Sequence, residues 1–187
     1  MKSIKSIGLM LTAAFLFNVS SAQTMKEETV EVGGAAMFPS KNIVENAVNS
    51  KDHTTLVAAV KAAGLVETLM SAGPLTVFAP TNAAFGMLPA GTVETLVKPE
   101  NKAKLTGILT YHVVSGRLDA DALKAKIKEG KGTAELATVA GGKLWVMKKD
   151  GKLWLKDENG GMAQITIKDV YQSNGVIHVI DHVVLPK

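Results

Sequence analysis

Residues 74–89 read PLTVFAPTNAAFGMLP and predict a buried strand that turns directly into a short helix. The nearly continuous apolar run at residues 75–79 is typical of a strand that is buried on both faces. Pro80 ends this strand because proline has no N–H to donate to a neighbouring strand. Thr81 or Asn82 can then cap the helix with a side-chain oxygen. Such a unit fixes the position of a sheet relative to a layer of helices.

Helices are predicted to dominate the first two thirds of the chain, and strands the last third. Apolar residues recur at helical spacing from Leu56 to Leu69, and Gly64 interrupts this pattern, which predicts two helices with different axes. Residues 111–114 are a second early apolar run and predict another strand. From Thr133 onward the apolar period changes to two. Segregated helices and strands of this kind indicate an α+β fold.

Composition excludes several classes of function. Hydrophobic residues make up 47% of the 187 residues and charged residues 20%, which suits a chain with a real core. The absence of cysteine excludes a disulfide framework, a thiolate metal site, a catalytic thiol and a lipid anchor on cysteine. Arg117 is the only arginine, and arginine is the residue that bidentate recognition of phosphates or bases favours. Nucleic acid is therefore not an expected partner.

The N-terminus has the parts of a secretory signal peptide. Lys2 and Lys5 give a basic start, and residues 7–17 form an apolar segment of the usual length. This segment is too short to cross a bilayer, which needs about 20 apolar residues. Small residues at 20–22 follow. We therefore expect cleavage after Ala22, a secreted or periplasmic protein, and no stable membrane insertion after cleavage.

Three segments are expected along the chain. Residues 1–22 are the signal peptide, residues 23–40 an N-terminal arm or linker, and residues 41–187 a single domain. The precursor has a net charge of +4, and the signal peptide contains two lysines and no acids. After cleavage, nineteen basic and seventeen acidic residues remain. The mature chain therefore has a net charge of only +2.

Three stretches carry a family resemblance. TVFAPTNAAF at residues 76–85, ILTYHVVSGRL at 108–118 and NGVIHVIDHVVLP at 174–186 resemble, in order, the signature motifs of fasciclin domains. The resemblance covers roughly residues 42–186. It implies a wedge of β-strands flanked by a group of helices. It also implies an adhesion or binding module, because most fasciclin domains act in this way.

Motifs for catalysis or metal binding are not found. The sequence has no HExxH, no GxSxG and no GxxxxGK[ST] pattern. His178 and His182 could share a face, with His112 or Asp181 as a third metal ligand, but no known spacing supports this. We favour structural roles for His112 and His178 as half-buried histidines, with hydrogen bonds to the backbone or to Thr81 or Asn82. No enzyme activity, cofactor or metal is expected.

Lysines gather around a predicted hairpin whose turn is Asp150-Gly151. They are Lys148, Lys149, Lys152 and Lys156. Such a cluster could hold an acidic glycan or an anionic cell surface. Interleaved acids such as Asp157 and Glu158 favour instead a solvated face that keeps strand edges from pairing.

The resemblance supplies candidate binding residues. In some animal fasciclin domains the Tyr-His segment and an Asp-Ile pair are thought to bind integrins. Tyr111 and His112 match the segment, and Asp169 and Val170 fall at the pair, with valine in place of isoleucine. Thr81 and Asn82 in the central loop complete the candidate set. A signal peptide of bacterial type makes integrin an unexpected partner here, so we expect a cell-surface or matrix protein or polysaccharide.

Two alternatives from other classes remain. A periplasmic carrier of small ligands predicts an apolar pocket between the helix layer and the sheet. A hydrolase of extracellular polymers predicts an acid and a base clustered in a cleft, and the sequence offers no spacing for such a pair. The favoured prediction is a non-enzymatic adhesion or binding module.

Overall fold

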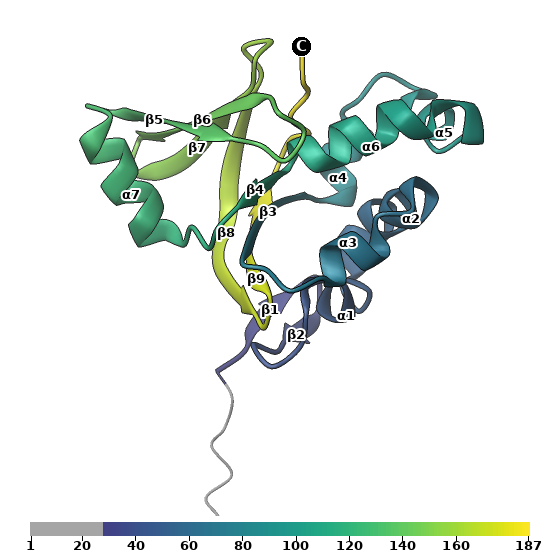
Figure 1. The fold of residues 1–187 in the computed structure, drawn as a ribbon, viewed down its shortest axis with the longest axis horizontal. Helices are drawn as coiled ribbons and strands as arrows, with labels where there is room; N and C mark the ends of the chain where they lie inside the picture. The colour runs from purple at the N-terminus through teal and green to yellow at the C-terminus, as the bar shows by residue number, and fades with distance from the viewer. Residues whose placement is uncertain (1–27) are drawn as a thin grey trace, which may run out of the picture.

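The computed structural model describes residues 28–187, in which helices flank a seven-stranded mixed sheet (Figure 1). The helices are α1 (Ile43–Ala47), α2 (Thr54–Ala63), α3 (Val66–Met70), α4 (Asn82–Gly86), α5 (Thr92–Leu96), α6 (Lys102–Tyr111) and α7 (Ala120–Glu129), with 3-10 turns at Lys51–His53 and Pro99–Asn101. The strands are β1 (Val30–Val32), β2 (Ala35–Met37), β3 (Leu75–Pro80), β4 (Val113–Ser115), β5 (Thr133–Ala137), β6 (Lys143–Lys149), β7 (Lys152–Lys156), β8 (Met162–Gln172) and β9 (Gly175–Ile180). The predicted α+β class is confirmed. The predicted signal peptide lies outside the described residues.

Strand β3 is the centre of the fold, as its apolar run predicts. It pairs antiparallel with β4 and parallel with β9. Val77 and Ala79 face one core, whereas Phe78 faces the other. Pro80 is its last residue, and the Thr81 hydroxyl then accepts a hydrogen bond from a backbone N–H in the first turn of α4. The strand and the capped helix both lie where the sequence predicts them.

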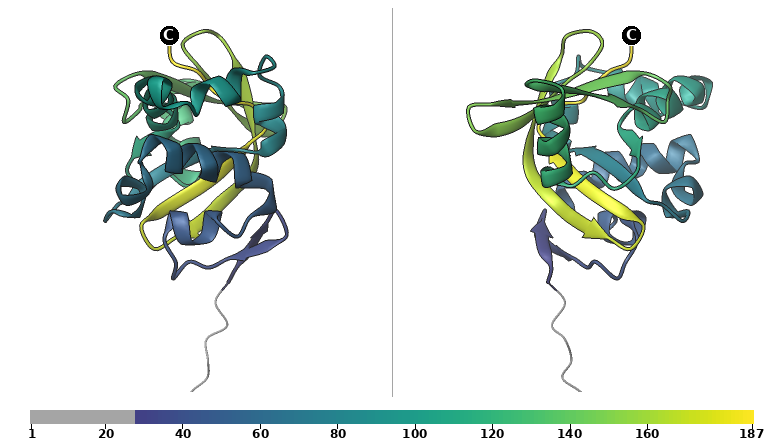
Figure 2. Two further views of the ribbon diagram at one scale, coloured as in Figure 1. Left: turned by 90° about the vertical axis from the view of Figure 1, so that its right-hand side faces the viewer. Right: turned by 60° about the vertical axis from the view of Figure 1, so that its left-hand side comes forward.

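The sheet curls until its two edges touch. Its strand order is β4-β3-β9-β8-β7-β6-β5. The long strand β8 pairs first with β7 and then with β9, and two register shifts bend it on the way (Figure 2). A bridge between Val114 and Thr138 joins the edge strands β4 and β5. This curvature produces the wedge of strands that the resemblance implies.

Two hydrophobic cores fill the two sides of the curled sheet. The first lies between helices α1–α6 and the β3–β9 pair, and it contains Leu56, Leu109 and Ile177. The second lies between α7 and strands β5–β8, and it contains Leu123 and Leu144. The alternating pattern of the last third therefore marks strands with one buried face, whereas the continuous runs of β3 and β9 are buried on both.

The strand predicted for residues 111–114 begins two residues later than expected. Tyr111 is the last residue of α6 and His112 is its C-cap, so the strand starts at Val113. An apolar run of four residues suits either a buried helix end or a buried strand, and packing decides between them. The other boundaries follow local signals more closely. Gly64, for example, ends α2 in the left-handed conformation, with φ of +73°.

The segment 23–40, expected to be an arm or linker, contains a short hairpin in its described part. Strands β1 and β2 pair antiparallel, and Val32 and Met37 are buried in the first core. Asn46 holds this segment by accepting a hydrogen bond from the Phe38 N–H and donating to the Phe38 carbonyl. From Val30 onward the segment is thus part of the folded unit.

A buried amide joins the turn before β9 to the helix layer. The Asn174 Oδ1 accepts a hydrogen bond from the Ile43 N–H at 3.0 Å. Its Nδ2 donates to the carbonyls of Leu69, at 2.8 Å, and Ser71, at 3.0 Å. Three backbone groups of two helix ends therefore depend on one side chain.

We expect Asn174→Ala to lower the free energy of unfolding by about 2–4 kcal/mol, because buried backbone groups lose their partners. The measurement is urea denaturation followed by circular dichroism. Asn159→Ala is the matched control, since the Asn159 Nδ2 also donates to two carbonyls, those of Leu185 and Pro186, but at an exposed site. The free energy of unfolding of the control should fall by less than about 1 kcal/mol. Equal losses in the two variants would contradict a stabilising role for the buried Asn174 hydrogen bonds.

Candidate functional site

The loop after β3 uses its polar side chains to hold helices together. The Asn82 Oδ1 accepts a hydrogen bond from the Thr55 N–H at 3.0 Å. Its Nδ2 donates to the Lys51 carbonyl at 2.8 Å. Thr81 caps α4. Both candidate residues are partly exposed, but their hydrogen-bonding groups are engaged within the protein.

Tyr111 is fully buried and joins α6 to the second half of the sheet. Its hydroxyl donates to the Lys143 carbonyl at 2.6 Å and accepts from the Glu158 N–H at 3.2 Å. Burial raises the pKa of Tyr111 to about 12, so the hydroxyl stays protonated and keeps donating. Tyr111 thus connects α6 to the start of β6 and to the loop after β7.

His112 is buried as a neutral ring with both nitrogens bonded. Its Nδ1 lies 2.8 Å from the Ile108 carbonyl, which can only accept, so Nδ1 carries the proton. Its Nε2 then accepts from the Val184 N–H at 3.2 Å. Burial lowers the pKa of His112 to about 4. The prediction of a structural histidine bonded to the backbone is confirmed, and the alternative bonds to Thr81 or Asn82 are not made.

Asp169 and His178 form a second internal group, at the bend of β8. Asp169 has φ of +60°, and its carboxylate accepts from the Ala120 N–H at 2.6 Å, at the start of α7. The Asp169 N–H points at the His178 Nδ1, 3.3 Å away. The His178 Nε2 lies 2.7 Å from the Leu118 carbonyl, to which it donates. Burial lowers the pKa of His178, in keeping with a neutral ring.

The six candidate residues do not form one site. Thr81 and Asn82 lie at the start of α4, Tyr111 and His112 at the end of α6, and Asp169 at the bend of β8. Val170 is buried and lines a cavity. Their role in binding stays a prediction, and the structure gives each of them a role in the fold.

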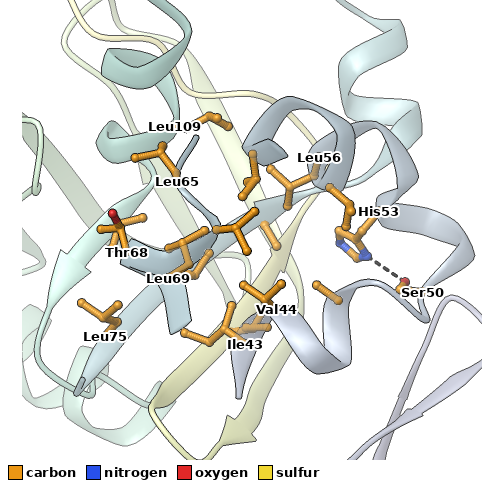
Figure 3. Close-up of a pocket in the computed structure, with 18 of the residues that line it drawn as sticks. Ile43, Val44, Ser50, His53, Leu56, Leu65, Thr68, Leu69, Leu75 and Leu109 are labelled. Carbon is orange, nitrogen blue, oxygen red and sulfur yellow. Dashed lines mark hydrogen bonds between the residues drawn. The ribbon is translucent and has the colours of Figure 1, made fainter. Parts of the chain in front are cut away.

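That cavity lies between the helix layer and the sheet and has a volume of about 140 Å³ (Figure 3). Its walls come from α1, α2, α3 and β3, with Leu109 of α6 and Ile177 of β9. Most lining side chains are aliphatic. His53 and Ser50 lie at one end, with the Ser50 Oγ 2.9 Å from the His53 Nδ1.

The outer face of strands β5–β8 carries a second notable group of side chains. Cross-strand pairing places Trp145 opposite Glu135 and Lys156, and Trp154 opposite Met147 and Gln164. We call this surface the tryptophan–lysine face. Its members are Glu135, Lys143, Trp145, Met147, Lys149, Lys152, Trp154, Lys156, Met162 and Gln164.

The tryptophan–lysine face is open to solvent, because α7 covers the opposite side of these strands (Figure 1). Its four lysines are exposed, and its tryptophans and methionines are partly exposed. The Lys149 Nζ lies 5.7 Å from the centre of the Trp154 ring, and Lys143 pairs with Glu135 at 3.0 Å. Both tryptophans of the chain thus share one flat, basic surface.

Within residues 28–187, no group of three histidine, aspartate or glutamate side chains is placed to hold a metal ion. Strand β9 ends at Ile180, so His178 and His182 do not share a strand face. His182 instead lies at the surface with its Nδ1 2.8 Å from the Asp181 carboxylate. Over the same described residues, no helix is both long enough and apolar enough to cross a membrane.

Comparison with known proteins decides the family. The fasciclin domain profile matches residues 51–186. The chain belongs to the fasciclin domain family. Protein sll1483 of Synechocystis is 51% identical over 160 residues, covering 86% of this chain and 82% of the relative. The cell surface glycolipoprotein MPB83 of Mycobacterium bovis is 31% identical over 179 residues, covering 93% of this chain and 74% of the relative.

Solved structures confirm the fasciclin fold. The FAS1 domain pair of the insect cell adhesion molecule Fasciclin I matches with a TM-score of 0.54 and 23% sequence identity, over 70% of this chain and 43% of that one. At this identity the likeness concerns the fold alone.

The three motifs of this fasciclin domain converge in space. The first supplies β3 and α4, the second the end of α6 and β4, and the third β9 and the tail. Because β3 lies between β4 and β9, the motifs form three adjacent strands of the sheet. Phe78 of the first motif stacks on His178 of the third, with ring centres 5.7 Å apart. Packing within the domain therefore accounts for much of the motif composition.

Sequence reasoning named three lysines of the tryptophan–lysine face, Lys149, Lys152 and Lys156, but it missed the two tryptophans and the cavity residue His53. The signal for the face was available, because the hairpin turn at Asp150-Gly151 and the two-residue period place Trp145 and Trp154 on the same side. His53 carried no such signal. Its side chain is buried beside Ala79 of β3, which lies 26 residues further along the chain.

Protonation of His112 should destabilise the domain below neutral pH. Its folded pKa of about 4 lies below the unfolded value, so the unfolded chain binds this proton first as the pH falls. The contribution of neutral His112 to the free energy of unfolding is fully present above about pH 6.5 and is lost as the pH falls towards 4. From pH 7 to pH 5 we expect a loss of about 2 kcal/mol from this group, measured by urea denaturation.

His112→Gln is the matched variant, because it removes this titration and leaves the carboxylates and the other histidines unchanged. Its stability should fall by about 2 kcal/mol less than that of the wild type over the same pH range. A side-chain NMR titration of the wild type provides a direct check. A His112 signal that titrates near pH 6.5 would show that the ring is not held neutral.

Proposed function

We propose that this fasciclin domain is a non-enzymatic binding module that acts outside the cytoplasm and binds an acidic polysaccharide on its tryptophan–lysine face. The predicted signal peptide supports export. The relative MPB83 is named as a cell surface protein, and the structural match is named as a cell adhesion molecule. The face itself is the observation that carries the proposal.

The shape of the face suits a sugar polymer. Trp145 and Trp154 lie on neighbouring strands of a sheet, and Met147 lies directly opposite Trp154. Indole rings on a sheet offer flat apolar surfaces with little rotational freedom. The C–H faces of sugar rings can lie on such surfaces, and the hydroxyl groups can remain in water. A polymer with successive rings could contact both tryptophans.

The charge of the face selects an acidic polymer over a neutral one. Four lysines stand among the ten face residues, against the single carboxylate of Glu135. Glu135 pairs with Lys143, which leaves three lysines to meet the carboxylate or sulfate groups of a polysaccharide. An exposed lysine is a mobile point charge that can follow irregularly spaced anions. Among the acids near the hairpin, Asp157 is buried, and the Glu158 carboxylate accepts hydrogen bonds from the Lys143 and Lys187 N–H groups.

A non-covalent role agrees with the use of the titratable side chains. The imidazoles of His112 and His178 are occupied by backbone partners in the interior. Exposed Asp121 pairs with Lys124 on α7. A hydrolase would need an acid and a base on either side of a substrate, and the described residues offer no such pair on the tryptophan–lysine face.

Charge reversal should weaken binding to polygalacturonate. We expect Lys152→Glu/Lys156→Glu to lower the affinity about tenfold at 50 mM salt, because two attractions become repulsions. The measurement is affinity electrophoresis or isothermal titration calorimetry with polygalacturonate. Lys126→Glu/Lys128→Glu on α7 is the matched control, with the same change of net charge on another surface, and its affinity should stay near that of the wild type.

Equal losses in the two double variants would mean that only the net charge matters, which would contradict a defined binding face. High salt should weaken the wild-type interaction, because exposed charges are screened. The absence of any binding to polygalacturonate, alginate or a sulfated galactan at low salt would reject the proposed function.

Loss of an indole should weaken the same interaction by a different route. We expect Trp145→Ala and Trp154→Ala each to lower the affinity for polygalacturonate roughly fivefold to tenfold, since an apolar stacking surface is removed. Trp145→Phe is the control, because it keeps an aromatic ring and should retain most of the affinity. The effect should persist in high salt, unlike that of the lysines. Unchanged binding in both alanine variants would exclude stacking.

A further inference from the structure

The cavity between the helices and the sheet is lined mostly by aliphatic side chains, and a buried polar pair lies at one end. Aliphatic side chains from Ile43, Leu65 and Leu69 form part of its walls (Figure 3). At the other side His53 and Ser50 are both buried, with exposed fractions of 3% and 2%. A polar group that is buried without a full set of hydrogen bonds is costly. Each polar atom at this end therefore requires an explanation.

The hydrogen bonds of His53 leave one of its nitrogens available. The Ser50 hydroxyl lies 2.9 Å from the His53 Nδ1, and we assign the hydroxyl as the donor of this hydrogen bond. The ring proton is then on Nε2, which is buried and has no hydrogen-bond partner in the described part of the chain. The Ala79 carbonyl lies near enough to favour the charged ring, but it does not meet the geometry of a hydrogen bond.

A comparison with His112 shows that a histidine beside a hollow does not always have an unpaired nitrogen. His112 lines a second hollow, of about 250 Å³, between α4, α5 and α6. There both ring nitrogens have backbone partners, at 2.8 Å and 3.2 Å. The histidine of the second hollow thus has no unpaired ring nitrogen. The cavity beside His53 combines aliphatic walls with a ring nitrogen that has no partner among the described residues.

We infer that this cavity is a binding site for a small uncharged molecule that has an apolar body and one hydrogen-bond acceptor, which meets the His53 Nε2. The aliphatic walls hold the body, and the ring nitrogen fixes the orientation. This inference is independent of the proposed function, because the cavity borders the first core and the tryptophan–lysine face lies over the second.

The volume and the charges limit the ligand. A dry apolar cavity of about 150 Å³ is known to hold a benzene ring, and this one has a volume of about 140 Å³. Lys61 is the only charged residue besides the titratable His53 in the lining, and Lys61 is exposed. Burial lowers the pKa of His53, so the ring is neutral at physiological pH. An acceptor without charge, such as a carbonyl, ether or hydroxyl oxygen, therefore fits this end.

Two probes of nearly equal size test the inference. Ethylbenzene has only the apolar body, whereas acetophenone adds a carbonyl oxygen at the same position. We expect the wild type to bind both, as measured by NMR titration of the whole mature protein, and to favour acetophenone about tenfold through the added hydrogen bond. Acetophenone alone should shift the resonance of the His53 Nε2.

Two variants separate the body of the ligand from its acceptor. His53→Phe keeps an aromatic ring without a donor, so it should bind ethylbenzene and lose the preference for acetophenone. Val44→Phe fills the cavity from α1 and should bind neither probe. Circular dichroism and thermal melting confirm that each variant is folded. If His53→Phe does not fold, the Nε2 resonance of the wild type decides the role of the acceptor.

Failure of both probes to bind the wild type would overturn the inference. Equal affinities of the wild type for the two probes, with no change at the His53 Nε2, would also overturn it. Binding of acetophenone to Val44→Phe with wild-type affinity would place the probe elsewhere and reject this cavity. Polygalacturonate binding, measured in the same samples, should be unchanged in both variants, so the outcome does not depend on the tryptophan–lysine face.

Discussion

The parallel pairing of β3 with β9 is the interaction on which the rest of the structure depends. It places Leu75 opposite Gly175, so everything from α4 to β8 is a connection between two neighbouring strands. Both strands are buried on both faces, and each of the two cores uses this pair as a wall. A local change in the pair therefore reaches the helix layer and the curled part of the sheet at once. The Asn174 amide reinforces the same place, where the chain enters β9.

Irregular backbone explains why residues of catalytic types are so common in the interior. The end of α6, the bend of β8 and the loop before α7 all leave backbone groups without partners in regular structure. His112, Asp169 and His178 provide those partners. Both ring nitrogens of His112 and of His178 are therefore bonded within the protein. His53 differs, since one of its nitrogens faces an apolar cavity without a partner.

The domain can separate two kinds of contact because it has two cores. A cavity can exist in the first core where short helices cover the sheet incompletely, and the second core is closed by α7 on one side of β5–β8. The other side of those strands is free to present Trp145 and Trp154 to solvent. A polymer outside and a small molecule inside would thus bind without a shared residue. The binding of one need not disturb the other, because separate packing layers carry the two sites.

Local signals were enough for the α+β class, the strand and capped helix at residues 75–86, the break at Gly64 and the hairpin at Asp150-Gly151. Each depends on the period of apolar residues or on the φ angles of a few neighbours, which a short stretch of chain sets alone. The end of α6 at Tyr111, the free nitrogen of His53 and the absence of a shared site among the candidate residues emerged only in the folded chain. Burial and hydrogen-bond partners are set by segments that lie far apart in the sequence, and a residue type does not reveal which of them it will meet.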